Sequence, residues 1–196
     1  LALAQQLASS PSFGQIAVTE SDSTREYTHK VFDSTVDTLL KVRDSLVLGD
    51  LDAAVEAITA AKRVEFYGFG ASAAVAFDAQ HKFFRLQITS AAYSDPHLQN
   101  ISATSLQPGD VVVAISQSGR SKALLDSMQI VKQVRGITIA LAPTDSPVAK
   151  TADIPIKVDA QEDNQIYIPL TSRIAHLAVI DVLAIGVAQK KGAKLD

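Results

Sequence analysis

From residue 64 onward, short apolar runs alternate with helical stretches, and this alternation constrains the fold more than any other feature. Strands are predicted at residues 64–67, 88–92, 111–115, 137–141 and 154–158. Helices are predicted between them at about 72–86, 97–105, 120–134 and 146–152, with a last one from 170 to about 190. Short apolar strands alternating with helices form a parallel sheet that is covered on both faces. The sequence therefore predicts an α/β fold, a three-layer αβα sandwich around a five-stranded parallel sheet.

Two further helices are predicted ahead of this alternation. Residues 21–48 repeat apolar side chains every three or four positions, as one face of a helix requires. Gly49 breaks this helix, and Asp50 can cap the next one. Residues 1–8 look like the end of a helix that begins upstream, and residues 9–14 look like a linker. Since the first residue is Leu1 rather than methionine, we expect a fragment, with residues 1–20 as a remnant plus linker and 21–196 as the domain.

Composition excludes several classes of function. The chain has 196 residues and a net charge of −3, so it lacks a basic field that would attract nucleic acid by itself. It contains no cysteine, which removes disulfides and thiolate metal sites. Its four histidines show no paired spacing, so no metal site is predicted, and we expect no cofactor. Polar residues interrupt every long apolar stretch, so no membrane span is expected, and we expect a cytoplasmic protein.

A serine-rich turn, Ser116-Gln117-Ser118-Gly119-Arg120-Ser121, directly follows the predicted strand 111–115. A strand, a glycine turn and a helix N-terminus together aim backbone N–H groups and the positive end of a helix dipole at an anion. Gly119 would let the backbone approach that anion, and the serine hydroxyls would donate to its oxygens. This pattern predicts a phosphate site. The alternative is a set of serines that only cap their own helix.

A second turn, Gly68-Phe69-Gly70-Ala71-Ser72, follows the strand 64–67. Its Gly68-x-Gly70-x-x-Ala73 spacing also matches the dinucleotide fingerprint, which makes a nicotinamide-binding domain an alternative. That fingerprint requires an acidic residue after the next strand, and Asp95 comes late for the role. In open α/β sheets, ligands bind at carboxyl ends of strands where the winding reverses. Both turns lie at carboxyl ends, so we expect them to hold one small phosphorylated ligand together.

Taken together, the two turns resemble those of the SIS domain, the sugar isomerase fold that binds phosphosugars. The resemblance covers about residues 25–190. It implies a phosphate-binding group made of Ser116, Gln117, Ser118, Gly119 and Ser121. It also implies that Gly70, Ala71 and Ser72 lie against the sugar.

Two further segments, residues 81–86 and 170–177, resemble the RpiR family of bacterial transcription regulators. Those proteins carry an N-terminal helix-turn-helix domain and a C-terminal SIS domain. The resemblance implies an effector-sensing domain that reaches DNA only through the absent N-terminal domain, and a homodimer or higher homo-oligomer. It is strongest for regulators of hexose catabolism, whose effector is 2-keto-3-deoxy-6-phosphogluconate. The alternative within the SIS fold is a phosphosugar isomerase or a related enzyme.

Few charged side chains are candidates for ligand contacts. Arg173 lies at the start of the last helix, where it could grip a carboxylate or pair with Glu162 or Asp163. His176, three residues later, and Glu162 are the two candidates for the base of an isomerase, but a structural histidine is the favoured interpretation of His176. No catalytic residue is therefore predicted for a sensing domain.

Overall fold

The computed structural model describes residues 18–160 and 170–192. The predicted remnant helix at 1–8 and the linker at 9–14 lie outside the described residues. The described helices are α2 (Thr24–Ser45), α3 (Leu48–Ala60), α4 (Ala71–Arg85), α5 (Pro96–Ser105), α6 (Lys122–Gln133), α7 (Pro147–Thr151) and α8 (Thr171–Lys190). The described strands are β1 (Val64–Gly68), β2 (Ser90–Tyr93), β3 (Val111–Ile115), β4 (Ile137–Ala142) and β5 (Ile154–Lys157).

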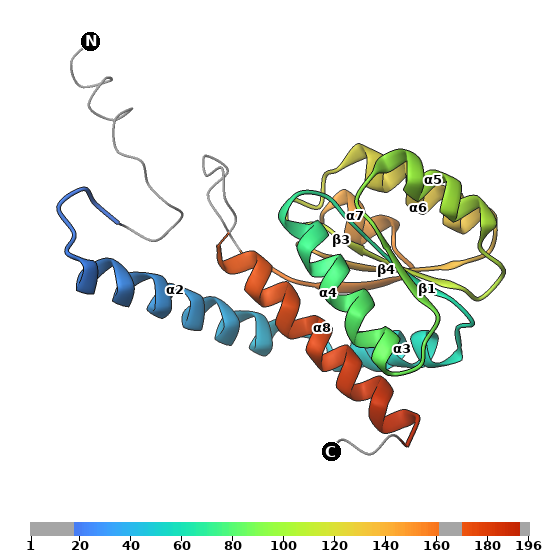
Figure 1. Ribbon diagram of the computed structural model, residues 1–196, viewed down its shortest axis with the longest axis horizontal. Helices are drawn as coiled ribbons and strands as arrows, with labels where there is room; N and C mark the ends of the chain where they lie inside the picture. Colours follow the sequence, from blue (N-terminus) through green and yellow to red (C-terminus); the bar gives the residue numbers. More distant parts are fainter. Residues whose placement is uncertain (1–17, 161–169, 193–196) are drawn as a thin grey trace, which may run out of the picture.

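The five strands form one parallel sheet in the order β2-β1-β3-β4-β5, so the predicted α/β class and sheet are confirmed. Helices α3, α4 and α8 cover one face, and α5, α6 and α7 cover the other (Figure 1). Helix α2 packs along α8, outside the three layers (Figure 1).

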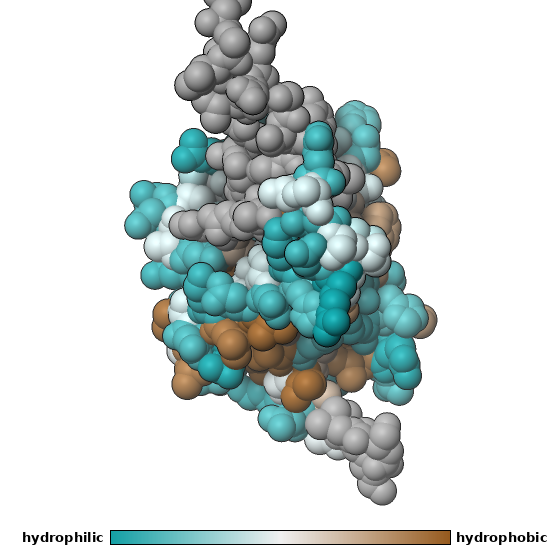
Figure 2. Space-filling view, turned by 90° about the vertical axis from the view of Figure 1, so that its left-hand side faces the viewer, coloured by the Kyte–Doolittle hydropathy of each residue, from teal (hydrophilic) through white to brown (hydrophobic). Residues whose placement is uncertain are grey.

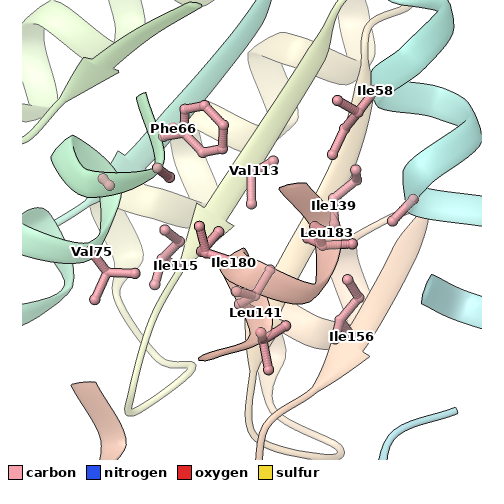
Figure 3. Close-up of a cluster of buried hydrophobic side chains, with 14 of the residues drawn as sticks. Ile58, Phe66, Val75, Val113, Ile115, Ile139, Leu141, Ile156, Ile180 and Leu183 are labelled. Atoms are coloured by element: carbon pink, nitrogen blue, oxygen red, sulfur yellow. The ribbon is translucent and has the colours of Figure 1, made fainter. Parts of the chain in front are cut away.

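Alternate residues of each strand enter the two halves of the core, as the period of two in a strand requires. Val113 and Ile115 on β3 meet Ile180 and Leu183 of α8 on one face (Figure 3). Val112 and Ala114 point to the other face, toward α6. Because β3 is buried on both faces, its sequence is continuously apolar rather than alternating.

Two predicted boundaries were wrong for identifiable reasons. Ile88 does not begin β2, because its N–H donates to the Phe83 carbonyl at 3.2 Å and Gln87 takes a φ of 59°. These two residues end α4 as a left-handed C-cap with an apolar residue behind it. Likewise, the break between the first two helices falls at the extended residues Leu46 and Val47, so Asp50 lies inside α3 rather than capping it.

A buried carboxylate on β1 was not anticipated. Glu65 is fully buried and accepts hydrogen bonds from the Tyr67 hydroxyl at 2.5 Å and the Ser102 hydroxyl at 2.7 Å. Arg63 forms an ion pair with it. Burial, followed by the adjacent Glu65 charge, raises the pKa of Tyr67 far above its ordinary value. The network joins β1 to α5. It gives an ion-pair partner and hydrogen-bond partners to a carboxylate that the full burial of β1 places in the core.

Helix α8 is long and apolar enough to cross a membrane by length and composition. Ala175, Val179, Ile180, Leu183 and Val187 are buried against the sheet and its neighbours, however. Half of its most apolar stretch lies inside the fold. A core helix of a water-soluble domain has the same composition, so this helix is weak evidence for a membrane span.

Candidate functional site

The two predicted turns leave adjacent strands at the same edge of the sheet. β1 pairs with β3, with Gly68 opposite Ile115 in the register. The chain winds outward from this pair in both directions, through β2 on one side and β4 and β5 on the other. The turns after β1 and β3 therefore flank the point where the winding reverses, which is where open α/β sheets bind ligands.

A pocket of about 170 Å³ lies at this edge. It brings together the first turn, the serine turn and the start of α8, three segments far apart in the sequence. The lining residues are Phe69, Ala71, Ser72, Ile115, Ser116, Gln117, Ser118, Ser121, Ser172, Arg173 and His176. Seven residues of the predicted site are among them, while Gly70 and Gly119 shape the turns without lining the pocket.

Each serine of the second turn accepts a backbone N–H. The Ser116 oxygen accepts from Gly119 at 3.0 Å, and the Ser118 oxygen accepts from Arg120 at 3.3 Å. Ser121 is the N-cap of α6 and accepts from Leu124 at 3.4 Å. A hydroxyl that accepts in this way keeps its own hydrogen to donate. The serines therefore make hydrogen bonds of the kind that the capping alternative predicts. These hydrogen bonds fix the serine oxygens, and each hydroxyl can still donate its hydrogen to a ligand.

Gly119 has a structural role in addition to the predicted approach to an anion. Its φ is +63°, and a Cβ there would lie 2.3 Å from both Cβ and Oγ of Ser146. Its carbonyl also accepts the N–H of Val148 at 3.0 Å. The glycine therefore lets the serine turn pack closely against the connection between β4 and α7, and this contact fixes the position of the serine turn.

The first turn is tight and also depends on glycine. A Cβ on Gly68 would lie 2.6 Å from the carbonyl oxygen of Ser72, whereas Gly70 adopts a φ of +55° in open space at the N-cap of α4. Asp95, the acidic residue of the dinucleotide alternative, caps α5 by accepting the Leu98 N–H at 2.9 Å. Its carboxylate thus has a structural contact of its own.

The start of α8 contributes the titratable side chains of the pocket. Arg173 is exposed and is the one charged residue among the described lining residues. Its predicted alternative partners, Glu162 and Asp163, lie outside the described residues. His176 is 1% exposed, and its Nε2 has no hydrogen-bond partner within the described chain. Burial lowers the pKa of His176 to about 4, so the imidazole is neutral at pH 7.

Sequence reasoning treated His176 as a minor candidate, and nothing in the sequence placed it in the same pocket as the serine turn. The only signal was its spacing from Arg173. A spacing of three on a helix puts two residues on neighbouring positions of one face. Which way that face points depends on how α8 packs against the sheet, and this is a property of the tertiary structure.

The comparisons with known proteins agree with the fold. The SIS domain model matches residues 57–186, which is more than half of the chain. This chain belongs to the SIS domain family. As a SIS domain, it is 43% identical over 194 residues to the HTH-type transcriptional regulator HexR of Escherichia coli (strain K12), covering 99% of this chain and 67% of HexR.

Two further comparisons add to this assignment. The HexR regulator of Pseudomonas aeruginosa is 38% identical over 190 residues, with 97% of this SIS domain and 67% of that protein covered. The structure of the Vibrio vulnificus NanR protein complexed with ManNAc-6P superposes with a TM-score of 0.80 at 20% identity, covering 97% of this chain and 67% of that one. The predicted resemblance to RpiR-family transcriptional regulators, and to HexR among them, is therefore confirmed.

Proposed function

We propose that this SIS domain senses a phosphorylated sugar acid for a bacterial transcriptional regulator of hexose and central carbon metabolism. The observation that carries the proposal is the chemistry of the pocket. Serine hydroxyls from both turns and an arginine from α8 line the pocket, while no carboxylate occurs among the described lining residues. Such a pocket favours an anion that also carries hydroxyl groups. The effector proposed is 2-keto-3-deoxy-6-phosphogluconate, because the relatives over nearly the whole chain are HexR regulators.

Each part of the effector has a proposed set of contacts. The phosphate would accept from the hydroxyls of Ser116, Ser118 and Ser121, near the positive end of α6. Gln117 and the backbone around Gly119 complete that group. Gly70, Ala71 and Ser72 would lie against the sugar, and Arg173 is proposed to bind the carboxylate. A bidentate guanidinium contact would distinguish a sugar acid from a neutral phosphosugar.

The regulatory role assigns DNA binding to another domain. We propose that residues 1–20 are the end of a helix-turn-helix domain with its linker, and that 21–196 form the sensing domain of a cytoplasmic regulator. Because the net charge is −3, the sensing domain should not bind an operator without its partner domain. A mobility shift of a defined operator by this chain at ordinary salt would contradict that expectation.

A homodimer is also proposed, with α2 as the contact surface. Leu39 packs into the core, whereas Phe32, Val36 and Leu40 remain exposed in a stripe with a spacing of four. Figure 2, which views the side from which α2 projects, shows hydrophobic surface in brown among teal regions. Sedimentation should show a dimer that Leu40→Glu converts to monomer. An unchanged dimer would place the interface elsewhere.

Calorimetry with 2-keto-3-deoxy-6-phosphogluconate tests the effector site. Ser116→Ala and Ser118→Ala should each weaken binding by about 1–3 kcal/mol, because each removes a hydrogen bond to a charged group. Ser105→Ala is the matched control, since its hydroxyl lies on α5 at the opposite edge of the sheet and donates to Ser102. Unchanged affinity in both site variants would refute the phosphate assignment.

An isomerase remains the alternative from the enzyme class. It needs a base close to the carbonyl carbon, and His176 is the one described lining residue that could accept a proton. A histidine with a pKa of about 4 is a weak base. We therefore expect phosphosugars and the sugar acid to stabilise the chain thermally without turnover. Conversion of an added aldose phosphate to its ketose would support the enzyme instead.

A further inference from the structure

His176 combines two properties that a purely structural histidine does not have. It is 1% exposed, and its Nε2 lacks a hydrogen-bond partner in the part of the chain that the structure describes. It also lines the pocket that the two turns form. A buried polar atom without a partner costs free energy, and such atoms are rare in native structures. An orphan nitrogen in a pocket wall is explained if a ligand supplies the missing partner.

We propose that Nε2 of His176 hydrogen-bonds an uncharged oxygen, a hydroxyl or a keto group, in the middle of the bound sugar acid. This inference rests on the proposed function, because it takes the same pocket as the effector site. It assigns a specificity-determining contact to a residue that the sequence favoured as structural.

The position of His176 within the pocket supports this assignment. The serine turn follows β3, whereas His176 belongs to the second turn of α8, so the two reach the pocket from different elements. A phosphate on the serine turn therefore leaves the body of the ligand to reach toward α8. Arg173, nearer the start of the same helix, is the only charged side chain among the described lining residues. The ligand's second anionic group belongs with that cation.

The electrostatic state of the imidazole then selects the kind of oxygen. Burial keeps His176 uncharged at pH 7, and its pKa is about 4. A neutral imidazole nitrogen can donate to a keto oxygen or accept from a hydroxyl, depending on its tautomer. It stabilises a carboxylate or a phosphate much less than a cationic side chain would. The site should thus prefer open-chain phosphorylated acids with a hydroxyl or keto oxygen between their two charged ends.

Two measurements on the whole chain test this inference. The first is nitrogen-15 NMR of histidine-labelled protein, with the His176 signals assigned through His176→Gln. Adding 2-keto-3-deoxy-6-phosphogluconate should shift the Nε2 resonance of His176, and inorganic phosphate should not. Exposed His29 on α2 is the internal control and should not move with either probe.

The second measurement is calorimetry with the same two probes. His176→Phe keeps an aromatic ring but removes Nε2, so it should weaken binding of the sugar acid about five- to thirtyfold. The dissociation constant of inorganic phosphate for this variant, measured by competition, should stay within about twofold of its value for the unsubstituted chain. His176→Gln places an amide at a similar reach and should recover most of the lost affinity. If the role of His176 were purely structural, His176→Phe would weaken the binding of both probes to a similar extent.

The two ideas fail in different ways. If the sugar acid binds and Ser118→Ala weakens it, yet the His176 resonance and the His176→Phe affinity are unchanged, the contact is refuted and the effector site stands. If neither Ser116→Ala nor Ser118→Ala weakens binding, or if no binding occurs, the effector site is refuted and this contact falls with it. If His176→Phe fails to fold, the NMR shift in the unsubstituted chain decides alone.

Discussion

Replacing Gly119 with alanine should destabilise the domain by about 3 kcal/mol and displace the serine turn. Two costs combine at this position. Adopting a φ of +63° costs an alanine about 1 kcal/mol relative to glycine. The added Cβ would also lie 2.3 Å from Cβ and Oγ of Ser146, and crowding of this kind costs about 1–3 kcal/mol. Ser146 is 93% buried and caps α7, so it has little room to move.

Two other glycines separate these costs. Gly109 has a φ of +87° with nothing within 4 Å of the added Cβ, so its alanine variant should lose only about 1 kcal/mol. Gly49 lies in α3 with open space and an ordinary φ, so its variant should be neutral or more stable by up to about 1 kcal/mol. The assay is urea denaturation followed by circular dichroism, with the free energies of unfolding compared at constant slope.

A double variant tests the contact itself. Ser146→Gly removes the two atoms that the new Cβ would approach to 2.3 Å and leaves only Pro143 Cδ at 3.2 Å, so Gly119→Ala should cost less in that background by about 1–2 kcal/mol. The effector affinity of Gly119→Ala should fall as well, because the serine turn moves. If Gly119→Ala costs no more than Gly109→Ala, the close approach to Ser146 does not constrain the loop and the reasoning is refuted.

Three further outcomes are expected. Burial lowers the pKa of His176 from about 6.5 to about 4, so between these pH values the unfolded chain binds a proton that the folded chain does not bind. The free energy of unfolding should therefore fall by up to about 3 kcal/mol as the pH drops from 6.5 through 4. His176→Gln should abolish that part of the acid dependence in urea titrations at several pH values, whereas exposed His29→Gln should retain it. Glu65→Ala should lower the free energy of unfolding by about 3 kcal/mol, since Arg63 loses its partner and a cavity opens; a loss below about 1 kcal/mol would show that the network contributes little. Saturating sugar acid at 100 times its dissociation constant should add about 2.7 kcal/mol, visible as a rise in the melting temperature that Ser118→Ala reduces.

The sheet and its layers could be predicted because their signals are local. The apolar runs at 111–115 and 137–141 match β3 and β4 to within one residue. Predictions failed where a side chain serves the end of a neighbouring element. Ile88 looks like the first residue of a strand, but it completes the cap of α4, and only the left-handed φ of Gln87 reveals this.

The candidate site divides in the same way. The serine turn could be recognised because its residues are consecutive, and adjacency of the two turns follows from parallel strand order. The contribution of His176 could not be derived, since it requires the packing of α8, which begins 50 residues after the end of the serine turn. The packing role of Gly119 could not be derived for a similar reason. Its neighbour, Ser146, belongs to a separate loop, and sequence gives no sign that the two approach.

Helix α8 has a mechanical consequence that goes beyond its place in the core. Its first two turns line the pocket, and one of its sides packs against α2, the first described helix of the chain. At 20 residues it is a rod about 30 Å long. Because close-packed interiors transmit strain, any tilt of α8 at its pocket end would also move the side chains on which α2 packs.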